Sequence, residues 1–135
     1  MRLVVIGLLL LGCGQKARPA PAPAEQAVTG IASIAGEWVA DDEMSWSYAL
    51  AITADGTLTG KIDRGKLPRC ERQGTLAYAG GRKFKLAMTK NTCEQAIANA
   101  GAAEVEVASF TGNALTLVVT TDGVAERRTY TRRPD

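Results

Sequence analysis

The most constraining feature of this chain is a two-residue alternation of apolar and polar side chains, which recurs in short stretches from about residue 46 to residue 130. In the first stretch, residues 46–52, large apolar side chains alternate with serine and alanine, which predicts a strand buried on one face. Comparable stretches follow at 57–62, 70–78, 83–88, 104–108, 115–119 and 124–130. With a short strand expected at 37–39, the sequence predicts about eight strands.

Tight-turn signals lie between these stretches. Asp55-Gly56, Gly80-Gly81, Gly112-Asn113 and Asp122-Gly123 each separate two alternating segments, as the connection of a β-hairpin does. Short strands joined in order by tight turns predict an antiparallel meander. About eight such strands can close into a barrel, which removes exposed edges. The expected fold class is therefore all-β, a small eight-stranded antiparallel meander barrel.

One segment breaks the alternation. Thr92 can cap the first amides of a helix while Gln95 reaches back, and alanines follow as far as Gly101, a residue suited to ending a helix. We therefore expect one short helix near residues 92–100.

The first thirteen residues have a composition of their own. Arg2 precedes a run of nine mostly aliphatic residues, 3–11. This run is shorter than the ~20 residues of a membrane-spanning helix and has the length of the apolar region of an export signal. It ends in Leu-Leu-Gly-Cys at Cys13, which resembles the lipobox of bacterial lipoproteins. The resemblance implies a signal peptide at 1–12 and a lipid on Cys13 that holds the protein at a membrane.

The next segment, residues 13–29, is expected to be the lipid anchor and an Ala/Pro-rich linker, because it carries almost no bulky apolar side chain. Proline-rich chain is extended at roughly 3 Å per residue. The linker would hold one domain, residues 30–135, away from the membrane. In the lipoprotein family an aspartate after the lipidated cysteine favours the inner membrane, and Gly14 stands there. The resemblance thus implies a lipid-anchored location in the cell envelope, at the outer membrane and facing the periplasm.

Two cysteines remain if Cys13 carries lipid. Cys70 and Cys93 can form a disulfide in an oxidising compartment, and closing that loop is worth about 3 kcal/mol. Two buried free thiols are the alternative. No metal site and no cofactor are expected, because the chain has no histidine and no Cys-x-x-Cys, whereas zinc sites use four such ligands.

Charge and side-chain chemistry exclude several functions. The formal net charge is only +2, so no nucleic-acid partner is expected. Without histidine the usual general base near neutral pH is missing, and we expect no enzymatic activity and no catalytic residues. Residues 61–90, which we call the basic stretch, contain nine bases and two acids. The basic stretch is either a patch for an envelope protein or anionic lipid, or a set of solvated strand faces.

A second resemblance involves Gly36-Glu37-Trp38, near the start of the domain. This segment is similar to the Gly-x-Trp motif of lipocalins and related calycins. In that superfamily the tryptophan closes one end of an eight-stranded barrel and an arginine of the last strand packs across it. The resemblance implies that Arg132 or Arg133 stacks on Trp38, with Gly36 part of the same barrel-end packing. The alternative is that Trp38 is a core residue of another β fold.

A lipocalin-like barrel implies a non-enzymatic module that binds a small apolar ligand or lipid. The expected lining residues are Trp46, Tyr48, Leu50, Ile52, Phe84, Leu86, Leu115 and Leu117. A small eight-stranded barrel filled by its own side chains would instead have no cavity. Two other functions stay open: a protein-interaction module of the envelope, like the small periplasmic protease inhibitors that share the calycin barrel, and a structural lipoprotein with no ligand.

Overall fold

The computed structural model describes residues 24–42, 44–93 and 102–134. The expected signal peptide at 1–12, the expected lipidation site Cys13 and most of the expected linker lie outside the described residues. So does nearly all of the short helix expected near 92–100. Of that segment only Thr92 and Cys93 are described, and they form a bend after a strand.

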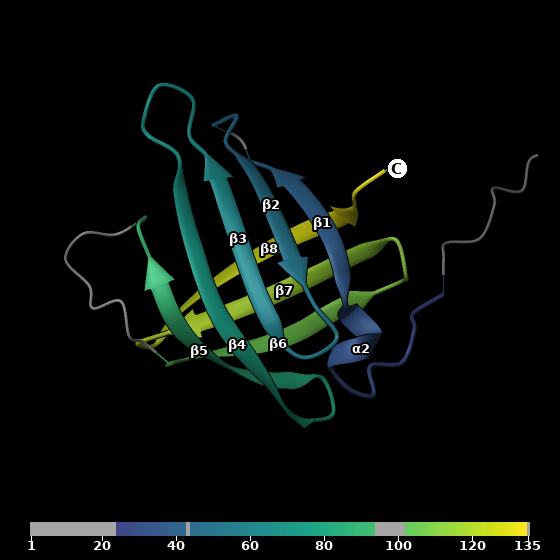
Figure 1. Cartoon of the computed structure of the whole chain (residues 1–135). Coiled ribbons are helices and arrows are strands. Elements are labelled where there is room, and N and C mark those ends of the chain that lie inside the picture. Colours follow the sequence, from purple (N-terminus) through teal and green to yellow (C-terminus); the bar gives the residue numbers. More distant parts are fainter. Residues whose placement is uncertain (1–23, 43, 94–101, 135) are drawn as a thin grey trace, which may run out of the picture.

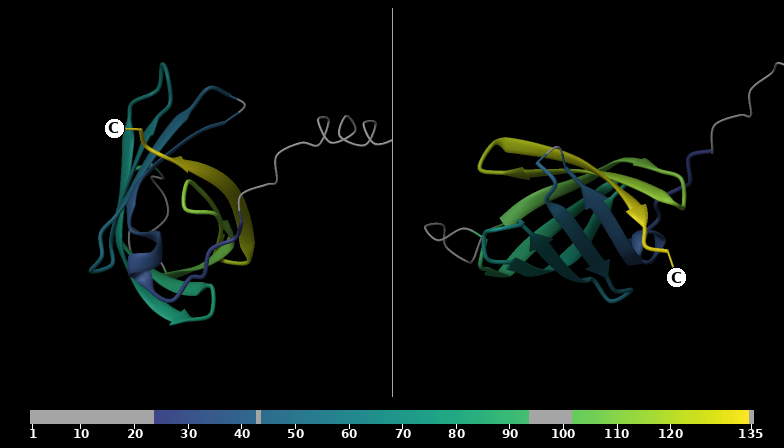
Figure 2. Two further views of the ribbon diagram at one scale, coloured as in Figure 1. Left: turned by 90° about the vertical axis from the view of Figure 1, so that its right-hand side faces the viewer. Right: turned by 90° about the horizontal axis from the view of Figure 1, so that it is seen from above.

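The fold is a closed barrel in which every strand runs antiparallel to its neighbours in the chain, and the last strand pairs with the first (Figure 1). This confirms the predicted eight-stranded meander. The two views of Figure 2 place the first four strands on one side of the barrel and the last three on the other. The elements are α2 (Ile31–Ile34), β1 (Gly36–Asp41), β2 (Ser47–Ile52), β3 (Thr57–Asp63), β4 (Cys70–Gly80), β5 (Lys83–Asn91), β6 (Ala102–Phe110), β7 (Ala114–Thr121) and β8 (Val124–Arg132).

The alternation in the sequence becomes the inner and outer faces of this sheet. In β5, Phe84 and Leu86 are buried while Lys83 and Lys85 are exposed. Neighbouring side chains of a strand point to opposite faces. A two-residue period therefore places apolar side chains in the barrel interior and polar side chains in solvent. The same pattern in β6 buries valines between exposed glutamates.

The turns also follow their sequence signals. Asp122 and Gly123 have φ values of 51° and 82°, the left-handed pair that a two-residue hairpin connection needs. Gly56 has a φ of 100°, and a β-carbon there would lie 2.7 Å from the carbonyl oxygen of Leu76. The backbone of β4 therefore approaches this turn as closely as only glycine permits.

Trp38 of β1 has no exposed surface. Its Nε1 donates to the carbonyl oxygen of Ile34 at 3.0 Å, and the Arg132 guanidinium lies 4.3 Å from its ring centre. The structure thus places Arg132 over the indole, whereas Arg133 lies 3.8 Å from the carboxylate of Glu37. Gly36 has a φ of 141°, a backbone conformation that favours glycine, and its missing side chain leaves room for Arg132 Nη1.

Residues 24–29, assigned above to the linker, lie beside Phe110, whose ring packs on Trp38. Val28 is buried in the core, and the amide of Gln26 donates to the carbonyl oxygen of Phe110 at 2.7 Å. Glu25 accepts from the Phe110 amide at 3.0 Å and lies 3.5 Å from Arg82. A single valine gives no periodic signal, and backbone hydrogen bonds leave no trace in composition, so the sequence did not predict this contact.

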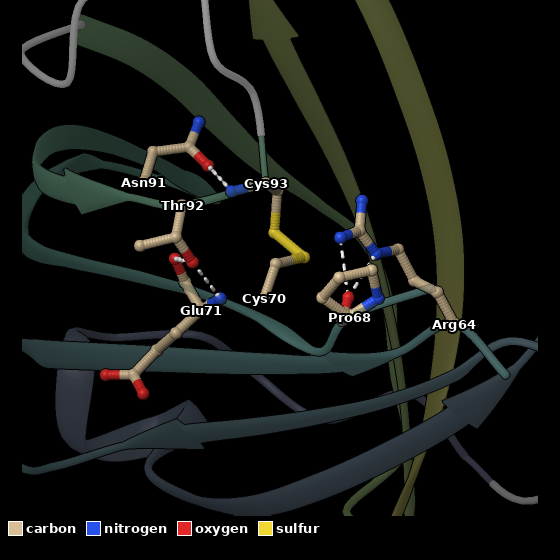
Figure 3. Close-up of a disulfide and its surroundings, with 7 residues drawn as sticks. All are labelled: Arg64, Pro68, Cys70, Glu71, Asn91, Thr92 and Cys93. Atoms are coloured by element: carbon tan, nitrogen blue, oxygen red, sulfur yellow. Dashed lines mark hydrogen bonds between the residues drawn. A yellow bond between two sulfur atoms is a disulfide. The ribbon is translucent and has the colours of Figure 1, made fainter. Parts of the chain in front are cut away.

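Cys70 and Cys93 form a disulfide, which confirms the predicted bridge (Figure 3). Cys70 begins β4 and Cys93 follows β5, so the bond joins neighbouring strands where their ladder ends. Beside it, the Glu71 amide donates to the Thr92 hydroxyl at 2.8 Å and the Thr92 amide to the Glu71 carbonyl at 2.9 Å. The disulfide therefore holds a connection that backbone pairing has already aligned.

Candidate functional site

The barrel interior contains a cavity of about 350 Å³. This volume lies within the ~300–1,000 Å³ range of small-molecule sites. The barrel is therefore not filled by its own side chains. Its apolar wall comes from the inward positions of the strands and from α2: Ile34, Leu50, Ile52, Leu58, Ile62, Leu76, Leu86, Met88, Val105, Leu117 and Val119.

Not every residue expected in the lining is found there. The cavity is lined by Trp46, Tyr48, Leu50, Ile52, Leu86 and Leu117. Phe84 and Leu115 are instead fully buried members of the packed core, with 1 % and 0 % of their surfaces exposed. Phe84 packs against the ring of Tyr78, and Leu115 pairs with Phe110 of β6. Both point inward as expected, but they lie where side chains fill the interior.

The cavity also has polar lining residues that the sequence did not indicate. β8 contributes Glu126, Arg128 and Tyr130. Their register partners on β7 are Val119, Leu117 and Leu115. These three polar residues of β8 therefore lie beside apolar residues of β7 on the inner face of the barrel. The apolar face of β7 was a usable signal, because residues paired across a ladder share a face.

Arg128 of β8 lies on the ring of Tyr48, which belongs to β2. Its guanidinium carbon lies 3.6 Å from the ring centre, within range of a cation–π contact. The Tyr48 hydroxyl donates to Asp42 Oδ2 at 2.9 Å. The other oxygen of Asp42 accepts from the amides of Met44 and Trp46, both at 2.9 Å. The loop between β1 and β2 thus fixes the position of the arginine.

These contacts shift two pKa values in opposite directions. Desolvation acts to raise the pKa of Asp42, but hydrogen bonds from the Trp46 amide, the Tyr48 hydroxyl and the Met44 amide, together with the charge of Arg128, lower it overall. The pKa of Tyr48 is raised by burial and by its hydrogen bond to Asp42, although Arg128 opposes the shift. At neutral pH this site therefore contains a carboxylate, a protonated phenol and a guanidinium.

The contact between Tyr48 and Arg128 lies beside the weakest part of the barrel. β1 and β8 pair at only two positions, Trp38 with Arg132 and Val39 with Thr131, whereas β7 and β8 pair at eight. The segment of β8 from Val124 to Tyr130 is thus paired with β7 alone. We call this interruption of the ladder the seam. Side chains rather than backbone hydrogen bonds bring β2 and β8 together there.

Tyr130 makes a pH dependence of stability testable. Burial raises its pKa above the ordinary 10.0, and the charges of Arg128 and Arg72 only partly offset this. The folded state therefore holds the phenolic proton more tightly than the unfolded chain, and this stabilisation is complete below pH 10.0 and lost as the pH rises through the raised value. Urea unfolding measured below and above the raised pKa should show that the free energy of unfolding falls more steeply with rising pH for the native chain than for Tyr130→Phe. Equal slopes would contradict the burial of this hydroxyl.

The bases of the basic stretch do not form one free patch. Arg69 lies 3.4 Å from Asp63, Arg82 lies 3.5 Å from Glu25, and Lys90 lies 3.8 Å from Glu71. Arg64 donates to the carbonyl oxygen of Pro68, as Figure 3 shows, and it also lines the cavity. Part of the charge excess is therefore compensated by exterior ion pairs, while exposed lysines such as Lys66, Lys83 and Lys85 form no ion pair with the described residues.

No protein family, curated protein or solved structure matches this chain. Within the described ranges, no helix has the length and apolar character needed to cross a membrane. Those same ranges bring together no group of three histidine, cysteine, aspartate or glutamate side chains that could hold a metal ion. The cavity and its polar residues are therefore the basis for the functional proposal.

Proposed function

We propose that this protein is a non-enzymatic binding module that takes up a small apolar ligand or lipid inside its barrel. The observation that carries the proposal is the cavity of about 350 Å³ behind a largely apolar wall. Eight-stranded barrels are just wide enough to hold one small ligand. Apolar side chains around an open volume favour a ligand that removes apolar surface from water.

The proposal includes a place in the cell envelope. The lipobox resemblance supports a lipid on Cys13 as the membrane contact, with the domain at the outer membrane and facing the periplasm. The disulfide between Cys70 and Cys93 suits such a compartment, because structural disulfides persist where thiols are not kept reduced. Residues 24–29 lie beside Phe110 and Trp38, so the chain would reach the domain on that side of the barrel.

The absence of histidine from the whole chain supports a binding role rather than catalysis. The ion pairs of Arg69, Arg82 and Lys90 weaken the alternative of an envelope-protein partner at the basic stretch, because their charges are already partly compensated. The cavity is thus the better-supported site.

A cavity-filling substitution tests the proposal. Gly60 lines the cavity, and a β-carbon there would meet no heavy atom closer than 4.0 Å, at Arg72 O and Leu50 Cδ1. Gly60→Val should therefore place its methyl groups in the ligand volume while favouring the strand conformation. We expect the neutral fluorophore N-phenylnaphthylamine to bind the native chain, and the variant to bind it about tenfold more weakly or worse.

Thr59→Val is the matched control, because Thr59 is the preceding residue of β3 and points to the opposite face of the sheet. It should bind the fluorophore as the native chain does. Thermal melting should show that both variants are folded. Absence of binding to the native chain, or equal binding by Gly60→Val, would refute a ligand site in this cavity.

A further inference from the structure

We infer that the ligand is an amphiphile with one apolar chain and an anionic head, and that Arg128, held on Tyr48 at the seam, binds the head. This inference rests on the proposed function, because it assigns a ligand class to the same cavity. It is carried by the surroundings of Arg128, by the charge of the lining, and by the arrangement of polar and apolar residues along the barrel.

Arg128 is half-buried at the cavity wall, and its guanidinium lies on the neutral ring of Tyr48. Within the described residues it forms no ion pair and no hydrogen bond; it affects Asp42 only through longer-range electrostatic attraction. A partly desolvated guanidinium keeps several N–H groups that can donate hydrogen bonds to an ionised oxygen. An anionic group bound there would replace the water that burial removes.

The cavity lining carries an excess of positive charge. Apart from Lys61, which is exposed on the outer face of β3 together with Thr59, the described lining residues include three cations and one carboxylate, Glu126. The three cations are Arg64, Arg72 and Arg128. Like charges around a low-dielectric cleft concentrate the opposite charge, so this interior favours an anion over a cation. The carboxylate of Glu126 opposes that preference, so removing its charge should have the opposite effect on anion binding to removing the charge of Arg128.

The polar inner face of β8 lies directly beside the apolar inner face of β7. Arg128 is paired with Leu117, which lies with Leu86 and Leu76 on the apolar wall. A ligand chain among these leucines would place its head beside Arg128. The seam is adjacent, and backbone hydrogen bonds do not close the barrel there. A planar guanidinium fixed on a ring is suited to bidentate binding of a carboxylate or phosphate.

The inference can be tested with three ligands that share a chain and differ in the head. Isothermal titration of the full chain with dodecanoate, dodecyl phosphate and dodecanol compares a carboxylate, a phosphate and a neutral hydroxyl. We expect the better anion to bind about tenfold or more tightly than dodecanol, as a charge-assisted hydrogen bond predicts. The tighter of the two anions identifies the head group.

Arg128→Gln should abolish the preference for the anion and leave dodecanol binding unchanged. Arg128→Lys should retain part of the preference for the anion, because lysine keeps the positive charge but lacks the two parallel N–H donors of the guanidinium. Arg127→Gln is the matched control: it removes the same charge from the next position of β8, which is exposed and faces away from the cavity. It should keep the native preference.

Glu126→Gln should strengthen anion binding, and this variant keeps the test decisive if Arg128→Gln does not fold. Equal affinity for all three ligands, or equal effects of Arg127→Gln and Arg128→Gln, would overturn the head-group assignment. If N-phenylnaphthylamine still binds in that case, the cavity function stands and only this inference fails. If neither the fluorophore nor any of the three ligands binds, both proposals fail.

Discussion

Replacing Trp38 by alanine is expected to lower the free energy of unfolding by about 3–5 kcal/mol, the usual range for removing a large buried aromatic side chain. Trp38 has no exposed surface, and its ring packs edge-on against Phe110 at a centroid distance of 6.2 Å. The substitution also leaves the Ile34 carbonyl without its indole donor and the Arg132 guanidinium without its platform. Since typical domains are stable by ~5–15 kcal/mol, this is a large fraction of the total.

Urea unfolding followed by circular dichroism measures the loss. Trp46→Ala is the matched control, because Trp46 is the other tryptophan and is only half-buried at the cavity. We expect the control to lose less than half as much, since it removes less contact with packed side chains. A loss of under about 1 kcal/mol for Trp38→Ala would show that the indole is not a packed part of the core.

Removing the disulfide has the second largest expected effect. The bonded cysteines are 23 residues apart, and opening a loop of that size should cost about 3 kcal/mol of stability, because the unfolded chain gains conformational freedom. For a domain of this size the melting temperature should fall by about 10–20 °C. Thermal melting with and without reductant measures the difference.

A chain with both Cys70→Ala and Cys93→Ala is the control for reagent effects. It should melt at the temperature of the reduced native chain and be insensitive to reductant. The native barrel should persist in that variant below its melting point, because the β4–β5 ladder aligns the two strands over eight residue pairs without the bond. A melting temperature unchanged by reduction would show that the bridge does not constrain the unfolded state.

The strands and turns could be predicted because they depend on neighbouring residues. The alternation of Lys83, Phe84, Lys85 and Leu86 is a two-residue pattern, and a strand is the structure that puts such a pattern on two faces. The Asp122-Gly123 turn likewise needs only local backbone freedom. The disulfide was predictable from the number of cysteines together with the lipobox resemblance.

Other features required the assembled barrel. The local sequence pattern did not predict that Glu126 and Arg128 point inward. Their pairing with Val119 and Leu117 of β7 shows that they do. Whether the interior is filled depends on distances across the barrel, which is why Phe84 lies in packed core and Leu86 lines a cavity. Val28 joins the core, and its neighbour Gln26 bonds to Phe110 of β6, far along the chain.

The sequence by itself therefore determined the class of fold, the order of its strands and the position of its turns, because each depends on residues close together in the chain. Tertiary structure alone decided that the barrel is hollow, that Arg128 lies on Tyr48 within it, and that β1 and β8 leave a seam. These features arise where distant strands meet around a closed sheet, and the free energy of such contacts depends on register and packing rather than on local composition.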